Sequence, residues 1–327
     1  MKAKEFKNLD EQVEILIKKG LTIKDEKYAK EVLLRENYFF LMGYRHLFND
    51  NTKEIKIDGY KEKTFLPGTR FEEIYSLFLF DRSLRNIIFK YLLVIENNFK
   101  SVTSYVLSRK YGYKEKEYLR PENFTSKPEH QRQVNDLISK MKRQIRINGP
   151  QHSATQHYSY NYGYIPLWIL VKVLSFGIVS ELFQILKEED KREVSQAYNV
   201  EIDDLLNYLP ILANYRNLCA HEDILFENKT SKPINDTIYH RLLKLPQEDG
   251  EFICGKNDLF ALVIILKQLL SKEDFKNFIL ELEDTLNALN YNLYTIKIDK
   301  VYKRIGFPDN WKDLMNIERR LDNEAEE

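Results

Sequence analysis

The 327-residue chain has little glycine, proline and cysteine, and its charges cancel. Only 11 glycines and 9 prolines are present, and long stretches contain neither, which is typical of a mostly helical protein. The two cysteines, Cys219 and Cys254, exclude a disulfide framework and lack the spacing of a metal site. The 50 basic and 50 acidic residues exclude a protein that coats nucleic acid through bulk charge, so any such site must be a local basic patch.

Long uninterrupted apolar runs are also missing. Of the two most apolar stretches, 167–186 is interrupted by charges and 259–270 is too short to cross a bilayer. The first five residues contain no apolar run of the kind that a signal peptide needs. We therefore expect a cytoplasmic protein without a membrane segment.

The sequence is rich in apolar residues at helical spacing. The chain is 43% hydrophobic and 13% aromatic, which is enough for a sizeable core. The stretch Arg70–Lys110 contains no glycine or proline and repeats its apolar residues with a helical period. It predicts one long helix, or two nearly collinear helices, at the centre of the core.

The expected fold class is therefore all-α. A short hairpin is expected over Glu54–Phe65, in a polar and irregular part of the chain that is the best candidate for a domain boundary. The predicted organisation has three parts: an N-terminal helical region at 1–60, a helical core at 61–290, and a C-terminal helical segment with an acidic tail at 291–327.

A compact polar motif occupies residues 214–221, Asn-Tyr-Arg-Asn-Leu-Cys-Ala-His. It combines a guanidinium, which is always charged, with an imidazole, which titrates near neutral pH. The motif is expected in a helix that opens at Leu209 and Pro210 and continues to Ile224, after a separate short helix.

The expected helix has one polar face. Asn217 and His221 share a stripe on it, and Arg216 lies about 140° around the helix from His221. Ala213 and Ala220 lie between the two charged side chains, so a substrate phosphate or a partner helix has room to approach closely.

Charged residues interrupt the apolar pattern of the long central helix. They are Asp81, Arg82, Arg85 and Glu96. A buried ion pair is the ordinary explanation. The alternative is that Glu96 or Arg85 orients Arg216 or His221 from the neighbouring helix.

A basic helix is predicted over Glu129–Ile147. Its cations are Arg132, Lys140, Lys142, Arg143 and Arg146. Either this is a solvated helix face or it follows the phosphates of a nucleic acid.

The next segment, 148–164, is expected to be a loop. It contains alternating tyrosines, among them Tyr158 and Tyr160, which either stack on unpaired bases or pack the loop onto the body. His152 and His157 have no accompanying cysteine or acidic ligands, so no metal site is predicted.

Four blocks in this order resemble the Abi-type abortive-infection proteins of bacteria, the AbiD and AbiF group. The blocks are Leu9–Val13 with Gly20–Leu21 and Tyr38–Tyr44; Phe80–Arg85 with Ile95–Glu96; Pro166–Trp168 with Leu174–Gly177; and Arg216–His221. The resemblance implies a role in phage defence, as the toxin of a toxin–antitoxin pair, with a small noncoding RNA as a regulatory partner.

The last block resembles the signature of HEPN ribonucleases, in which an arginine and a polar residue precede a histidine. The resemblance implies a HEPN-like helical bundle, with an N-terminal helical extension and additional C-terminal helices. It also implies that Arg216 and His221 are a catalytic pair and that Asn217 is the polar residue. RNA is then the substrate.

RNA carries its own nucleophile, the 2′-hydroxyl, so no metal or cofactor is expected. The imidazole would move protons, and the guanidinium would stabilise the charged phosphorane. The expected products carry a 2′,3′-cyclic phosphate and a 5′-hydroxyl. Because one motif offers one imidazole, a homodimer through the motif helix is expected to supply the second.

Two other functions remain open from the sequence. One is a non-catalytic RNA-binding module that holds a structured RNA through Lys140, Lys142, Arg143 and Arg146. The other is a helical scaffold that senses a phage protein, for which no salt-dependent RNA binding is expected.

Overall fold

The computed structural model describes residues 5–57 and 59–318. This part of the chain contains fifteen α-helices and two small two-stranded sheets, which confirms the all-α fold class. The end of the predicted acidic tail, residues 319–327, lies outside the described residues. None of the described helices is both long and apolar enough to cross a membrane.

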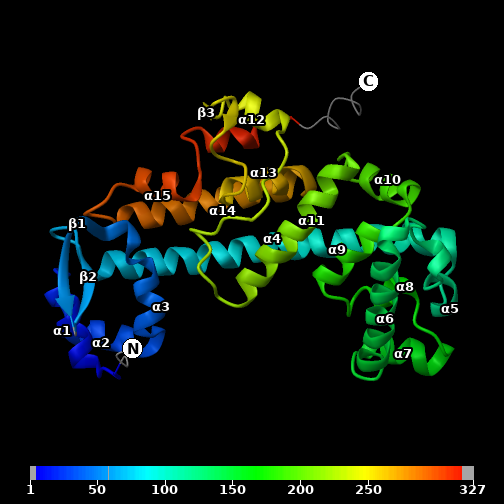
Figure 1. Cartoon of the computed structure of the whole chain (residues 1–327), viewed down its shortest axis with the longest axis horizontal. Helices are drawn as coiled ribbons and strands as arrows, with labels where there is room; N and C mark the ends of the chain where they lie inside the picture. Colours follow the sequence, from blue (N-terminus) through cyan, green and yellow to red (C-terminus); the bar gives the residue numbers. More distant parts are fainter. Residues whose placement is uncertain (1–4, 58, 319–327) are drawn as a thin grey trace.

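Helix α4, Phe71–Tyr111, is the axis of the molecule (Figure 1). It is one continuous helix of 41 residues, so the first of the two predicted alternatives is correct. At 1.5 Å per residue it extends for about 60 Å. Helix α14 (Lys272–Tyr291) packs along it, and α11 (Ile202–Ala220) crosses it.

The N-terminal elements gather around the first turns of α4 (Figure 1). They include the predicted hairpin, whose strands pair antiparallel. The bounds are α1 Leu9–Lys18, α2 Glu26–Glu36, α3 Tyr38–Met42, η1 Gly43–Phe48, β1 Asn49–Ile57 and β2 Tyr60–Phe65. The predicted boundary at residue 60 falls at the start of β2, and the three-part division stays a prediction.

The middle of the chain forms a second group of helices at the other end of α4 (Figure 1). Here α9 packs against α6, α4 and α11. The bounds are α5 Glu115–Tyr118, η2 Pro121–Asn123, η3 Pro128–His130, α6 Gln131–Asn148, α7 Ser153–Tyr162, α8 Leu167–Leu170, α9 Phe176–Ile185 and α10 Glu188–Gln196.

The prediction of a loop over 148–164 is wrong, because α7 occupies most of it. Pairs four residues apart stabilise this helix: the rings of Tyr158 and Tyr162 lie 5.3 Å apart, and the Asn161 amide lies 3.0 Å from a ring nitrogen of His157. Gly163, with a φ of 74°, ends it.

The C-terminal elements return along α4. Their bounds are α12 Ile238–Leu242, β3 Gln247–Glu248, β4 Glu251–Phe252, α13 Leu259–Leu269, α14, α15 Ile298–Ile305 and η4 Trp311–Met315. Glu73, fully buried in the first turn of α4, accepts hydrogen bonds from the backbone N–H of Tyr294 at 2.7 Å and of Thr295 at 2.6 Å. This carboxylate therefore fixes the chain after α14 to the start of the central helix.

Helix α12 contains a fully buried histidine with an assigned tautomer. The Nδ1 of His240 accepts a hydrogen bond from the Thr237 backbone N–H at 3.0 Å, so Nε2 carries the proton. Nε2 in turn lies 2.9 Å from the Gly255 carbonyl oxygen, to which it donates. Burial lowers the pKa of His240 below its ordinary value of 6.5.

The free energy of unfolding is expected to decrease as the pH is lowered below 6.5, and His240 is expected to contribute to this decrease. Below pH 6.5 the unfolded chain binds this proton more readily than the folded chain does. The contribution is therefore complete above pH 6.5 and is lost as the pH falls toward the folded pKa, by at most about 1.4 kcal/mol per pH unit. Urea unfolding between pH 7.5 and pH 5 tests this. The His240→Gln variant should lose less stability over that range than the wild type, and equal losses would contradict the assignment.

Candidate functional site

The motif helix α11 begins earlier than predicted. It runs from Ile202, and Pro210 lies inside it with its side chain exposed. The ring removes only the hydrogen bond to Leu206, and the buried Leu205, Leu209 and Leu212 hold the helix on both sides of the proline. The predicted separate short helix and the opening at Leu209–Pro210 are therefore wrong.

The helix also ends earlier, at Ala220 instead of Ile224. Glu222 adopts a left-handed φ of 57°, and the Asp223 N–H donates to the Leu218 carbonyl at 3.2 Å. This hydrogen bond joins the sixth residue of the turn to the first, as in a Schellman motif, but here the left-handed residue is not a glycine. The turn makes His221 the C-cap residue, directly after the last helical residue, where its side chain is exposed.

The polar face of α11 is exposed at its C-terminal end. Asn217, Ala220 and His221 are all exposed, and the Asn217 carbonyl accepts the His221 backbone N–H at 3.0 Å. Ala213 is buried, so the expected alanine floor is open only at Ala220.

Helix α4 brings Glu96 to Arg216. The Nε atom of Arg216 lies 3.5 Å from Oε2 of Glu96, whose side chain is only 6% exposed. The other carboxylate oxygen accepts a hydrogen bond from the Lys100 ammonium at 2.6 Å. Glu96 therefore lies between two cations. Its contact with Arg216 is an ion pair without a hydrogen bond, since neither Nε of Arg216 nor Oε2 of Glu96 has a hydrogen-bond partner among the described residues, and the Arg216 side chain remains 33% exposed.

Arg85 is placed differently. Its Nη1 atom donates to Asp81, to the Tyr44 hydroxyl at 3.2 Å and to the Asp223 carbonyl at 3.2 Å. Among the hydrogen bonds and ion pairs of the described residues, none joins Arg85 to Arg216 or His221. Arg85 instead holds the chain that leaves His221.

Asp81 completes this anchor, and it is a site residue that the sequence reasoning did not assign. Its carboxylate is fully buried and accepts the backbone N–H groups of Leu225 at 3.1 Å and Phe226 at 2.8 Å. It also accepts the Tyr44 hydroxyl at 2.7 Å, and the Tyr44 ring stacks on Phe226. The signals in the sequence are its break in the apolar pattern of α4 and its place in the block Phe80–Arg85.

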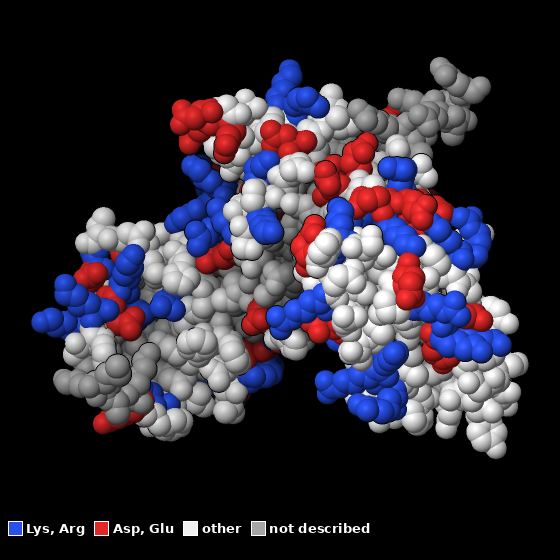
Figure 2. Space-filling model, turned by 45° about the vertical axis from the view of Figure 1, so that its right-hand side comes forward, with Lys and Arg blue, Asp and Glu red and all other residues white. Residues whose placement is uncertain are grey.

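The basic residues of α6 are not brought to the motif. Lys140 pairs with Glu181 of α9 at 2.6 Å. Lys142, Arg143 and Arg146 are exposed, whereas the buried side of α6 packs on α9. Figure 2 shows acidic and basic side chains mixed over much of one face of the molecule.

The tyrosines of α7 form part of an exposed aromatic cluster. Tyr162 packs between Tyr158 and Tyr164, and the Tyr164 ring lies 5.5 Å from that of Tyr113. Tyr160 is 89% exposed. Both tyrosines proposed for RNA binding, Tyr158 and Tyr160, thus lie on α7, and no hydrogen bond or ring contact joins them to the motif helix among the described residues.

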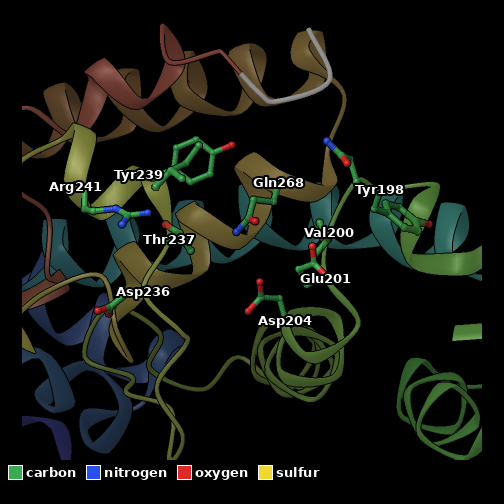
Figure 3. Close-up of a pocket in the computed structure, with 11 residues that line it drawn as sticks. Tyr198, Val200, Glu201, Asp204, Asp236, Thr237, Tyr239, Arg241 and Gln268 are labelled. Atoms are coloured by element: carbon green, nitrogen blue, oxygen red, sulfur yellow. The ribbon is translucent and has the colours of Figure 1, made fainter. Parts of the chain in front are cut away.

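A small pocket of about 200 Å³ lies between the start of α11, α12 and α13 (Figure 3). Asp204 accepts the Asn235 amide at 2.8 Å, and Asp236 pairs with Lys256. Asp236 therefore has its charge neutralised by a cation, whereas Asp204 has only a neutral hydrogen-bond donor. Within residues 5–57 and 59–318, no three histidine, cysteine or acidic side chains gather where they would hold a metal ion.

Comparison with known proteins identifies a family. The model of the Abi-like protein family matches residues 31–227, from α2 to the residue after Phe226. No curated protein and no solved structure matches the chain. The matched range contains Glu96, Arg216, His221 and the Asp81 anchor, and covers more than half of the sequence. The chain therefore belongs to the Abi-like protein family.

Proposed function

We propose that this protein is a metal-independent endoribonuclease of the HEPN type, the toxic effector of an abortive-infection system. The observation that carries the proposal is the pairing of Arg216 with the buried Glu96, next to the exposed end of α11 where His221 lies. A guanidinium in an ion pair and an exposed imidazole are the two kinds of group that metal-free RNA cleavage needs. Membership in the Abi-like family supports the role in abortive infection.

His221 is the group that moves protons in this proposal. It takes a proton from the 2′-hydroxyl or gives one to the leaving 5′-oxygen, while the free face of Arg216 binds the phosphate oxygens. Asn217, one turn before His221 and equally exposed, is placed to donate to the same phosphate.

A second chain is part of the proposal, because cleavage uses an acid and a base on opposite sides of the phosphate and each motif has one imidazole. A homodimer that joins two α11 ends supplies both, and Ala220 leaves the space for it. Sedimentation would show the dimer. A monomeric variant with full activity would exclude this arrangement.

The test of the function is the chemistry of the products. Purified protein is incubated with total RNA in excess EDTA, and the new ends are mapped. The proposal requires 2′,3′-cyclic phosphate and 5′-hydroxyl ends at an undiminished rate. Cleavage that stops in EDTA, or that leaves 3′-hydroxyl ends, would refute it.

Glu96→Gln is expected to lower kcat by about 10- to 100-fold with little change in KM. The amide keeps the shape of the side chain but no longer fixes the cation of Arg216. The control is Glu281→Gln on α14. It removes a carboxylate that pairs with Lys90 of α4, the helix that carries Glu96. If both variants lose the same activity, Glu96 has only a structural role.

A further inference from the structure

A large cleft runs along the exposed side of α11. Its volume is about 1080 Å³, and its floor includes Asn207, Pro210 and Asn214. One wall comes from the start of α6, with Lys127 before it and Gln133 on its first turn. The opposite wall is the segment 229–232.

The floor of the cleft leads to the motif. Asn207, Pro210 and Asn214 follow one another at intervals of three and four residues, and Asn217 and His221 continue the same series. Such residues form one stripe along a helix. A polymer that lies in the cleft and follows this stripe therefore reaches His221.

The wall 229–232 is held in place. The Thr230 N–H donates to the Asn257 carbonyl at 2.8 Å, and the Asn207 amide donates to the Pro233 carbonyl at 3.2 Å. Oδ1 of Asn207 is buried and has no hydrogen-bond partner among the described residues. The Asn207 side chain therefore serves to hold this wall, and the cleft has a preformed shape.

The charge of the cleft is positive along this wall. Lys229 and Lys232 line it, and neither forms an ion pair with any described residue. On the other side, Glu188 pairs with Lys127 at 3.7 Å and with Lys191 at 3.2 Å, which neutralises that acid. Asp203 is the remaining acidic side chain of the lining.

We propose that this cleft binds the single-stranded RNA segment next to the cleavage point, with Lys229 and Lys232 on its phosphates. The inference rests on the proposed function, since it names the path by which the substrate reaches His221. Asn214 and Gln133, both exposed in the lining, have amide groups of the kind that bind the edges of unstacked bases, which a duplex buries in its pairs. An acidic peptide would satisfy the lysines but would leave these amide groups unused.

The experiment measures binding in the His221→Ala background, so that the RNA stays intact. The probe is a labelled single strand of about 12 nucleotides, within the site sizes of such grooves. The cleft variant carries both Lys229→Ala and Lys232→Ala. The matched control carries both Lys272→Ala and Lys276→Ala. The control lysines are exposed on α14 and lie outside the cleft.

The cleft variant should bind the strand about tenfold more weakly, and the slope of log K against log salt should fall by about 1.4. The control pair should bind as the parent does. The inference fails if the cleft variant and the control variant weaken binding equally, or if the annealed duplex binds as tightly as the single strand. It also fails if an oligoglutamate of equal length displaces the single strand.

Failure of the cleft and failure of the proposed function give different results. If His221→Ala abolishes cleavage while the cleft variant binds normally, the cleft inference is wrong and the ribonuclease stands. If His221→Ala cleaves like the wild type while the cleft variant loses binding, the cleft stands and the catalytic role of His221 is wrong.

Discussion

Replacement of His221 by alanine is expected to lower the rate of RNA cleavage by about 10²- to 10⁴-fold, the usual contribution of a general acid or base. The side chain is exposed at the end of α11, so its loss removes no core packing and leaves the fold intact. Binding of RNA should change little, because the imidazole acts on the reacting atoms and does not hold the strand.

The measurement pairs cleavage rates with binding of an uncleavable strand that lacks the 2′-hydroxyl at the cut. His152→Ala is the control, since it removes another exposed histidine, just before α7. In cells, growth arrest by the wild-type chain should disappear with His221→Ala and persist with His152→Ala. If the His221→Ala chain cleaves as the wild type does, His221 has no catalytic role. If neither chain cleaves while both bind RNA, a non-catalytic RNA-binding module is the better function.

The elements that the sequence predicted well are those specified by local pattern. Helix α4 follows from 41 residues with apolar side chains at helical spacing and no glycine or proline. The ends of α11 were mispredicted because both depart from the usual signals. Pro210 is tolerated inside the helix, and Glu222 adopts the left-handed conformation that glycine normally provides.

The candidate site was only partly predictable, for a different reason. The motif itself is local, so Arg216, Asn217 and His221 are visible in one segment. The pairing of Glu96 with Arg216 depends on where α11 crosses α4, and nothing in the spacing along the chain defines that crossing. The same holds for Asp81, which binds a segment that follows it by 144 residues.

Asp81→Asn is expected to lower the free energy of unfolding by about 3–5 kcal/mol, the usual effect of breaking a buried ion pair. The change leaves the cation of Arg85 buried without its counter-ion. The carboxylate accepts the Leu225 N–H on one oxygen and the Phe226 N–H on the other. The amide of asparagine has only one oxygen, so one of these two N–H groups loses its acceptor and faces the NH₂ group instead.

Urea unfolding followed by circular dichroism measures this change. Glu283→Gln is the control, because it removes the carboxylate of the exposed pair with Lys312 and should change stability by about 1 kcal/mol or less. A second variant, Asp81→Leu with Arg85→Met, replaces both charges by apolar groups and should regain part of the loss. If Asp81→Asn is no worse than the control, the carboxylate does not hold the structure.

Activity distinguishes the anchor from a purely structural ion pair. Asp81 fixes Leu225 and Phe226, and Arg85 fixes the Asp223 carbonyl, so together they determine how the chain leaves His221. At a temperature where Asp81→Asn is still folded, its kcat should be reduced while RNA binding in the cleft is kept. Full activity in that folded variant would mean that the Schellman turn at Glu222 positions His221 without help from α4.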